Sequence, residues 1–475
     1  MAYIMGLRMQ NRCLPLIIDD YVGPDDPVRV YDAFVDTLDL PSLGILIESK
    51  PGPDEYHPAV LLKLLIYGYS YGIRSSRKLE RACCHNLSFQ WLTGGLQPDY
   101  RTIARFRIRY KEQIKQILKQ CVRICVDLEL IEGNVLFTDG SKFRANASIN
   151  NTRTQEKCER ALERLDKTID SLLEECEHID QEEEGTASLV KLRKKIADKE
   201  QLSQKIRKSL QVLQETKATS HNSTDEESIK AKNRQGIHAS YNVQINVDGQ
   251  NGLIVHGEAI SDCNDYNHLK EQVDKSSQTL GHHPEYVCAD SRYSSIKDLK
   301  EIPADIQVIV PDQEVLVKER TDTNDKSSKN DFTYDQASDE YICPIGTRLK
   351  LSTISNKRDS KVYRAYGPTC RSCLHLGICT INKSGRGVER SFYEEIQQRI
   401  IANYKSTRGQ QIYKLRKEKV EHVYGHMKRN LGAGQFMLRG RDKVNAEVSL
   451  LSTCFNIARM ITIVGIPQLL MKLTG

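Results

Sequence analysis

Asn134-Val135-Leu136-Phe137-Thr138-Asp139 is the stretch that decides the fold, a short apolar run that ends in an acidic residue. Such a run predicts a buried strand. A second run of the same kind, Glu285-Tyr-Val-Cys-Ala-Asp290, predicts another. Side chains at the carboxyl ends of strands in an α/β sheet leave the core but remain rigidly held. Asp139 and Asp290 are therefore candidate site residues, although each also fits a residue that simply starts a turn after its strand.

The segments around these two runs predict the rest of a sheet. Residues 240–248 alternate with period two, residues 249–252 supply a turn, and residues 253–260 return as a strand. Helical patterns follow at 266–280 and 294–301, and a last strand at 306–311. This order predicts a mixed α/β (α+β) fold with a hairpin rather than a doubly wound sheet. Its first parts are residues 131–150 and 232–311.

Residues 151–231 interrupt that sheet with a heptad pattern. Apolar residues recur at steps of three and four from Leu162 to Ile179, and again from Leu189 to Leu213. A break at Glu182 to Thr186 separates the two seams. The segment therefore predicts an antiparallel helical hairpin inserted into the sheet domain.

Residues 1–130 show helical patterns. Pro58 stands at a plausible first helical position, and Asp99 or Thr102 is placed to cap a later helix. That later helix carries several arginines that fit contacts with a phosphate backbone: Arg101, Arg105, Arg107 and Arg109. Residues 1–130 are therefore predicted to form a helical DNA-binding region. A helix-turn-helix and a plain helical bundle both fit its pattern.

A helix over residues 411–428, in the final helical segment 392–475, supplies a third carboxylate. Tyr413, Lys417, Glu421, Tyr424 and Lys428 are spaced by four, four, three and four residues, hence on one face, which we expect to be buried or half-buried. Glu421 can complete a metal site on that face while the lysines and tyrosines hold phosphates. The rival carboxylate, Glu418, shares its face with Lys414 and His422, which indicates a solvent-facing position.

Composition and charge favour a polyanion partner. The chain has 475 residues and a net charge of +6, with 39% hydrophobic and 28% charged residues, which excludes collagen-like and wholly disordered classes. From Ile401 to Gly475 there are 13 Lys and Arg against 4 Asp and Glu, a local +9. This suits nucleic acid, although ordinary solvated helices also fit. No apolar run reaches about 18 residues, so we expect a cytoplasmic protein without membrane attachment.

Four clustered cysteines lie in the polar, β-leaning segment 312–391. They are Cys343, Cys370, Cys373 and Cys379, spaced C-x₂₆-C-x₂-C-x₅-C. Four thiols with one C-x₂-C pair favour a structural Zn²⁺ over a metal-free thiol cluster or a redox pair.

In combination these motifs resemble bacterial insertion-sequence transposases of the DDE class. The motifs that carry the resemblance run in order along nearly the whole chain: Arg12–Tyr21, Asp19–Val22, Asp26–Arg29, Asp32–Asp36, Pro98–Arg107, Thr138–Ser141, Tyr241–Gln244, Ala289–Tyr293, and the helix with Tyr413, Arg416, Glu421 and Lys428. The family's signature has three residues between its basic residue and its glutamate. Arg416 and Glu421 enclose four here and Lys417 restores three, so either can be the phosphate-contacting residue.

The resemblance implies an RNase H-like core in which Asp139, Asp290 and Glu421 bind two Mg²⁺ or Mn²⁺ ions. Asp139 would bridge both ions, and two ions about 3.5–4 Å apart can bind the attacking and leaving oxygens of a phosphodiester. Lys428 and Arg416 or Lys417 would orient the phosphate, and Tyr413 and Tyr424 would stack on a base or sugar. The expected function is cleavage and transfer of double-stranded DNA at element ends by a homodimer, nucleoid-associated when acting. A non-enzymatic DNA-binding protein and a nuclease that does not join strands are the alternatives.

Overall fold

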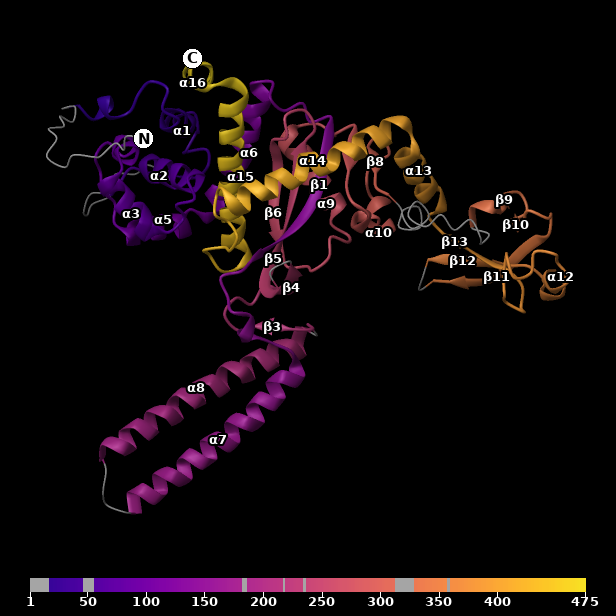
Figure 1. Cartoon of the computed structure of the whole chain (residues 1–475), viewed down its shortest axis with the longest axis horizontal. Helices are drawn as coiled ribbons and strands as arrows, with labels where there is room; N and C mark the ends of the chain where they lie inside the picture. The colour runs from indigo at the N-terminus through magenta and orange to yellow at the C-terminus, as the bar shows by residue number, and fades with distance from the viewer. Residues whose placement is uncertain are drawn as a thin grey trace, which may run out of the picture. The chain divides into compact units, whose positions relative to one another are not determined.

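The computed structural model shows a mixed α/β protein, as predicted, divided into two compact units (Figure 1). The structure describes residues 17–45, 55–181, 186–216, 218–233, 236–311, 329–356 and 359–475. The first unit holds Met1–Asp265, Lys275–His283 and Glu418–Gly475. The second holds Tyr266–Asp274 and Pro284–Lys417. The first part of the Arg12–Tyr21 motif and residues 312–328 of the cysteine-bearing segment lie outside the described residues.

The N-terminal part of the first unit is helical. Its elements are η1 (Ile18–Tyr21), α1 (Val28–Asp36), α2 (Pro58–Ser70), α3 (Ser76–His85), α4 (Leu87–Leu92), α5 (Tyr100–Arg109) and α6 (Lys111–Asp127). Pro58 occupies the first position of α2, as expected. Asp99 caps α5, because its Oδ1 accepts the backbone N–H groups of Arg101 and Thr102 at 2.6 and 2.9 Å.

An antiparallel sheet forms the centre of this unit. Its strands within this unit are β1 (Val135–Arg144), β4 (Ile229–Asn233), β5 (Gly236–Asp248) and β6 (Ile254–Ile260), with β5 paired to the other three. The prediction that the first strand ends at Asp139 is wrong: β1 continues to Arg144, and Asp139 pairs with Ile245 near its middle. The polar residues after Asp139 stay in the strand because pairing with β5 continues to Ser240.

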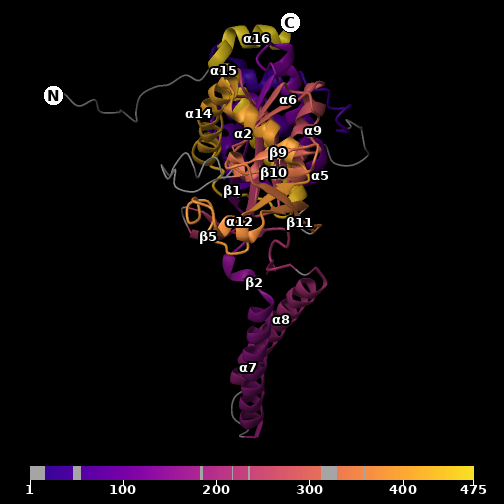
Figure 2. The same cartoon turned by 90° about the vertical axis from the view of Figure 1, so that its right-hand side faces the viewer.

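Two long helices occupy the heptad-patterned interval. α7 (Gln155–Gln181) and α8 (Thr186–Thr216) lie side by side in Figures 1 and 2, and their seam residues form two small clusters. Cys158, Leu165, Ile206 and Leu213 make one cluster, and Cys176, Leu192 and Ile196 make the other. Residues 182–185 of the predicted break lie outside the described residues. The short elements η2 (Ile149–Asn151), β2 (Thr152–Arg153) and β3 (His221–Asn222) flank the pair.

The C-terminal helices complete the first unit. α15 (Arg441–Val464) packs against α6, β6 and α2, and α16 (Ile466–Thr474) follows it. α15 is long and apolar enough to cross a membrane, but 67% of its apolar window is buried inside the protein, as in the core helix of a soluble fold. Its buried residues run almost without interruption from Val444 to Ile457.

The second unit combines a parallel strand pair with a separate antiparallel sheet. β7 (Tyr286–Cys288) and β8 (Gln307–Ile309) are parallel neighbours. The antiparallel sheet has the order β13-β12-β11-β10-β9, from the strands β9 (Thr333–Asp335), β10 (Glu340–Ile342), β11 (Arg348–Ser355), β12 (Ser360–Arg364) and β13 (Gly387–Ser391). Shorter elements and helices of this part are η3 (Ser291–Tyr293), α10 (Ile296–Leu299), η4 (Lys329–Asp331), α12 (Gly367–Arg371) and α13 (Glu394–Lys405). Two helices, α9 (Leu269–Leu280) and α14 (Thr407–Arg429), each have residues in both units.

Candidate active site

The second half of α14 is bound to the strand that carries Asp139. The Tyr424 hydroxyl lies 2.6 Å from the backbone oxygen of Asp139 and 2.9 Å from that of Val243, so it donates to both carbonyls. Four residues further along the helix, Lys428 Nζ donates to Ser141 Oγ at 2.6 Å. Asp139 and Ser141 share one face of β1 because strand residues two apart point the same way. This face of β1 is therefore the one that meets α14.

The environment of Lys428 is unusual for a lysine. Its ammonium lies 4.5 Å from the centre of the Phe143 ring. Burial lowers the Lys428 pKa to about 8, and the charge of Asp139 opposes that shift. The ammonium has thus lost part of its hydration. An anionic group bound next to it would therefore stabilise it more than the same group would stabilise an exposed lysine.

Glu421 lies one helical turn before Tyr424 but is exposed. Lys417 is exposed as well, whereas Tyr424 is only 6% exposed. The expectation of a buried or half-buried face is therefore wrong for Lys417 and Glu421, because the covered side of α14 beside Glu421 is that of Val420 and Val423, which are fully buried. The rival carboxylate Glu418 is also exposed, so exposure alone does not separate it from Glu421.

Asp290 follows β7 in the second unit and starts a turn. Its Oδ1 accepts the backbone N–H of Arg292 at 2.9 Å, which caps η3. Tyr413, in the first half of α14, lies near enough to Arg416 and Asp290 to interact with both electrostatically. Burial raises the pKa of Tyr413, the charge of Arg416 lowers it, and the charge of Asp290 raises it. The guanidinium of Arg416 lies 5.8 Å from the centre of the Tyr413 ring and lowers the pKa of the Cys288 thiol, which burial raises to about 12. Asp290, Tyr413 and Arg416 thus share one electrostatic environment.

The predicted carboxylates are divided between the units. Asp139 and Glu421 belong to the first and Asp290 to the second. Across the described ranges, no group of three or more His, Cys, Asp or Glu side chains is arranged to hold a metal ion. The three residues nevertheless offer only carboxylate oxygens, the donor type that suits Mg²⁺ and Mn²⁺.

The four clustered cysteines lie in the second unit, and none of them forms a disulfide bond. Cys343, Cys370 and Cys379 pack against one apolar cluster that includes Tyr341 and Tyr363. Two sulfur atoms accept backbone N–H groups at 3.3 Å: Cys343 Sγ from Thr347, and Cys373 Sγ from His375. Such contacts favour a sulfur that carries negative charge.

The arginines of α5 divide into two kinds. Arg101 and Arg105, as well as Arg109, are exposed. Arg107 is buried and donates to the Tyr69 hydroxyl at 2.9 Å and to the carbonyl of Arg74 at 3.1 Å, so the expectation that it faces a phosphate backbone is wrong. Its position on the inner face of α5 explains the difference, because Ile103 and Phe106 are buried there too.

The sequence analysis did not predict the buried ion pair between Arg74 and Glu447. Arg74 Nη1 donates to Glu447 Oε1 at 2.8 Å, and Glu447 is fully buried. Arg74 also donates to the carbonyls of Gly432 and Gln435, just after α14. The partners are 373 positions apart in sequence, and the only hint was a single acidic residue in the apolar run of α15.

Comparison with protein families identifies the class. Residues 342–461 match the family model of a transposase DDE domain, and residues 16–109 match that of a second transposase domain. Both matches are thus to transposase domains, a class of proteins that act on DNA. More particularly, the two matches confirm the resemblance to DDE-type insertion-sequence transposases. No curated protein and no solved structure matches the chain.

Proposed function

We propose that this protein cleaves DNA at the ends of an insertion sequence and transfers the strands to a new site, with Asp139, Asp290 and Glu421 as its catalytic carboxylates on an RNase H-like core. The observation that carries the proposal is the binding of α14 to the strand of Asp139. Tyr424 and Lys428 make that contact, and Glu421 lies one turn away on the same helix. The match of residues 342–461 to a transposase DDE domain includes Glu421.

The donor set fits divalent metal. All three residues offer carboxylate oxygens, and their accessibility ranges from partly buried for Asp139 and Asp290 to exposed for Glu421. Two bound Mg²⁺ or Mn²⁺ ions would activate the attacking oxygen and stabilise the leaving oxygen of the phosphodiester.

Other side chains position the DNA. Lys428, held beside Asp139, would bind a phosphate oxygen as a fixed cation. Arg416 is the better candidate than Lys417 for the second phosphate contact, because it is partly buried near Asp290 whereas Lys417 points to solvent. Tyr413 remains a candidate for stacking. Tyr424 is buried with its hydroxyl on two carbonyls, so it positions the strand instead of stacking on a base.

Binding of the element ends would rest on the N-terminal helices and on pairing of two chains. Arg101 and Arg105 are exposed on α5, where they can reach phosphates. Two DNA ends must be brought together, which favours a homodimer on DNA. The site of action is then the cytoplasm, at the nucleoid.

From the sequence pattern we also propose a structural Zn²⁺ for Cys343, Cys370, Cys373 and Cys379, although the described structure does not arrange three of them to hold a metal ion. The support is the pair of N–H contacts to Cys343 and Cys373 sulfur atoms. Metal analysis of the purified protein should give about one zinc per chain, lost in Cys373→Ser, and a zinc-free wild-type protein would exclude the site.

The test of the catalytic assignment is Mg²⁺-dependent nicking of DNA that carries the element's ends. We expect Asp139→Asn, Asp290→Asn and Glu421→Gln each to lower the nicking rate at least about 100-fold while mobility-shift binding of the same DNA persists. Glu418→Gln is the matched control, since it removes a carboxylate from the same exposed stretch of α14, and it should nick at a rate near that of the wild type.

Near-normal nicking by Asp139→Asn would overturn the assignment. Joined products in a strand-transfer assay separate a transposase from a nuclease that only cuts. DNA binding by the wild-type protein without any nicking in Mg²⁺ or Mn²⁺ would instead indicate a non-enzymatic DNA-binding protein.

A further inference from the structure

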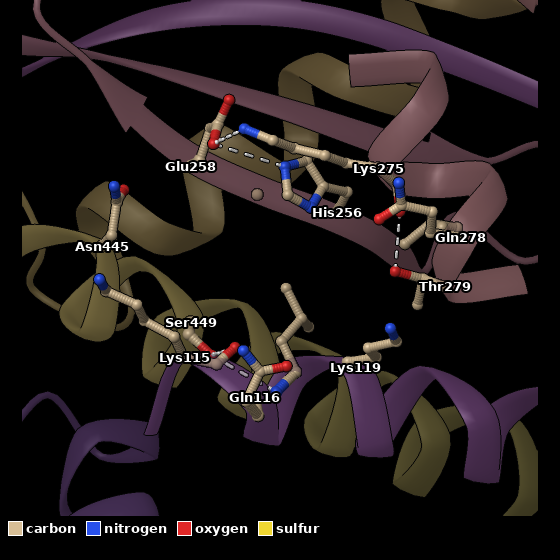
Figure 3. Close-up of a pocket in the computed structure, with 13 residues that line it drawn as sticks. Lys115, Gln116, Lys119, His256, Glu258, Lys275, Gln278, Thr279, Asn445 and Ser449 are labelled. Carbon is tan, nitrogen blue, oxygen red and sulfur yellow. Dashed lines mark hydrogen bonds and ion pairs between the residues drawn. The ribbon is translucent and has the colours of Figure 1, made fainter. Parts of the chain in front are cut away.

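A cavity of about 340 Å³ opens in the first unit, away from the candidate active site (Figure 3). Its walls come from α6, the edge strand β6, the end of α9 and the start of α15. The polar side chains that matter are Lys115 and Lys119 from α6, His256 and Glu258 from β6, Lys275 from α9, and Asn445 from α15. Three lysines around one hollow exceed its single carboxylate.

Two of the polar residues that line the cavity, His256 and Glu258, lie on the face of the sheet opposite to that of Asp139. Asp139 pairs with Ile245, while His256 pairs with Asn246 and Glu258 with Gln244. Neighbouring positions along β5 point to opposite faces, so His256 and Glu258 share the face of Asn246 and Gln244 rather than that of Asp139. None of the candidate active-site residues lines the cavity, so a ligand bound there does not occupy that site.

The single carboxylate is already neutralised. Glu258 Oε2 accepts from Lys275 Nζ at 2.5 Å and lies 3.9 Å from His256 Nε2, and both contacts are drawn in Figure 3. Burial raises the Glu258 pKa, but the neighbouring His256 and Lys275 lower it by more, so it ends at about 2. Glu258 thus stays ionised and paired, and it repels an incoming anion little.

The lysines of α6 differ in their partners. Lys115 forms ion pairs with Glu112 at 3.0 Å and with Asp442 at 3.2 Å. Lys119 is partly buried, and in the described part of the chain no acidic side chain lies within ion-pair distance of it. In Figure 3 its ammonium extends from α6 toward the helix of Thr279. Lys119 is therefore the cation whose charge is left for a ligand.

Amide donors complete a site for an oxyanion. Asn445 uses its Oδ1 to accept the N–H of Ala259 at 2.6 Å, which fixes the side chain in the wall of the cavity and leaves its NH₂ group as a donor. Gln116 and Gln278 supply further amides to the lining. An ammonium together with neutral N–H donors is the combination that binds phosphate oxygens.

We propose that this cavity binds a phosphate group through Lys119 and the amide of Asn445. The phosphate belongs either to a backbone of DNA held away from the cleavage site or to a free polyphosphate such as pyrophosphate. Both sources offer the same oxygens, and the volume of about 340 Å³ admits either a backbone phosphate with its sugar or a small polyphosphate.

The first measurement is calorimetric titration of the full-length protein with pyrophosphate in EDTA, so that cleavage activity does not enter. We expect Lys119→Gln to weaken binding at least fivefold and Lys119→Arg to restore it. Lys472→Gln removes one exposed lysine of α16 outside the cavity and should leave binding within twofold of the wild type. The same affinity in Lys119→Gln and the wild type, with both folded, would overturn the proposal.

The second measurement identifies the source of the phosphate. Anisotropy titrations with a non-specific DNA duplex over a range of salt give the slope of log affinity against log salt. If the ligand is a backbone phosphate, Lys119→Gln should reduce the magnitude of that negative slope by about 1. Pyrophosphate should then also compete with the duplex for the protein. If the ligand is a free polyphosphate, Lys119→Gln should leave the salt slope of duplex binding unchanged and weaken only the binding of pyrophosphate. Both measurements record binding and not cleavage, so they can be made even if the protein cuts no DNA. A failure of the proposed catalysis is therefore distinguishable from a failure of this binding site.

Discussion

Glu447→Gln removes the charge of a carboxylate that the fold buries completely. In the wild type, Glu447 accepts from Arg74 at 2.8 Å and from the backbone N–H groups of Met437 and Leu438 at 3.0 and 3.1 Å. The amide keeps the shape but leaves the Arg74 guanidinium, 7% exposed, without a counter-ion. Breaking one side of a buried pair costs about 3–5 kcal/mol. Two carbonyls still bind Arg74, so we expect the lower end, about 3 kcal/mol.

Urea unfolding of the full chain, followed by circular dichroism, measures this loss. With a urea m-value of about 3 kcal/mol/M, the midpoint should fall by about 1 M. Asp442→Asn is the matched control, because Asp442 pairs with Lys115 at the surface, where 63% of its side chain is exposed, and its loss should cost less than about 1 kcal/mol.

An unchanged midpoint in Glu447→Gln would refute the reasoning. A paired substitution sharpens the result, since Arg74→Met with Glu447→Leu removes both charges and fills the space with apolar atoms. We expect that double variant to recover stability relative to Glu447→Gln, because no unpaired buried charge remains. Equal losses in the two variants would mean that packing, rather than charge, dominates at this position.

Three further predictions concern the sheet and its neighbours. Tyr424→Phe removes the hydroxyl that binds the carbonyls of Asp139 and Val243; it should cost about 1–3 kcal/mol in urea unfolding and slow nicking about tenfold, and wild-type values for both would contradict the positioning role. Because the Lys428 pKa is lowered to about 8, kcat/KM for nicking should fall as pH rises through about 8, and Lys428→Arg should remove that alkaline limb; an identical pH profile would exclude Lys428 as the titrating group. The Glu258 pKa of about 2 lies below its ordinary value of 4.5, so its contribution, at most about 3 kcal/mol, is present above pH 4.5 and is lost as pH falls through 2. The difference in unfolding free energy between wild type and Glu258→Gln should therefore shrink from pH 6 to pH 3, and a constant difference would contradict this linkage.

Local features of the fold were predictable because local physics determines them. The Asp99 cap of α5 depends on N–H groups two and three residues away, and the structure has it. The seam of α7 and α8 follows from apolar residues at helical spacing, and Leu165, Leu192 and Ile206 are buried as that spacing predicts. Strand periodicity likewise located β5 and β6, with boundaries that differ by a few residues from those predicted.

Features that depend on distant partners were not predictable in this way. The strand of Asp139 continues past the polar residues Gly140 to Lys142 because β5 pairs with them. The sequence of that polar stretch alone does not predict the pairing. The exposure of Glu421 depends on which side of α14 is covered, here that of Val420 and Val423, and helical spacing alone does not give that side. Lys119 belongs to an ordinary charged helix in sequence, and only the positions of β6 and α15 make it part of a cavity.

The contacts that fix α14 explain how the catalytic test can be interpreted. Tyr424 binds the carbonyl of Asp139, and Arg74 binds the carbonyls of Gly432 and Gln435, so both donors depend on backbone acceptors. Backbone oxygens persist whatever side chain is attached to them. Asp139→Asn therefore retains the acceptor for Tyr424, and the isosteric amide disturbs the strand little. A loss of nicking in that variant consequently reports the missing carboxylate, whereas a loss in Tyr424→Phe reports the position of the strand.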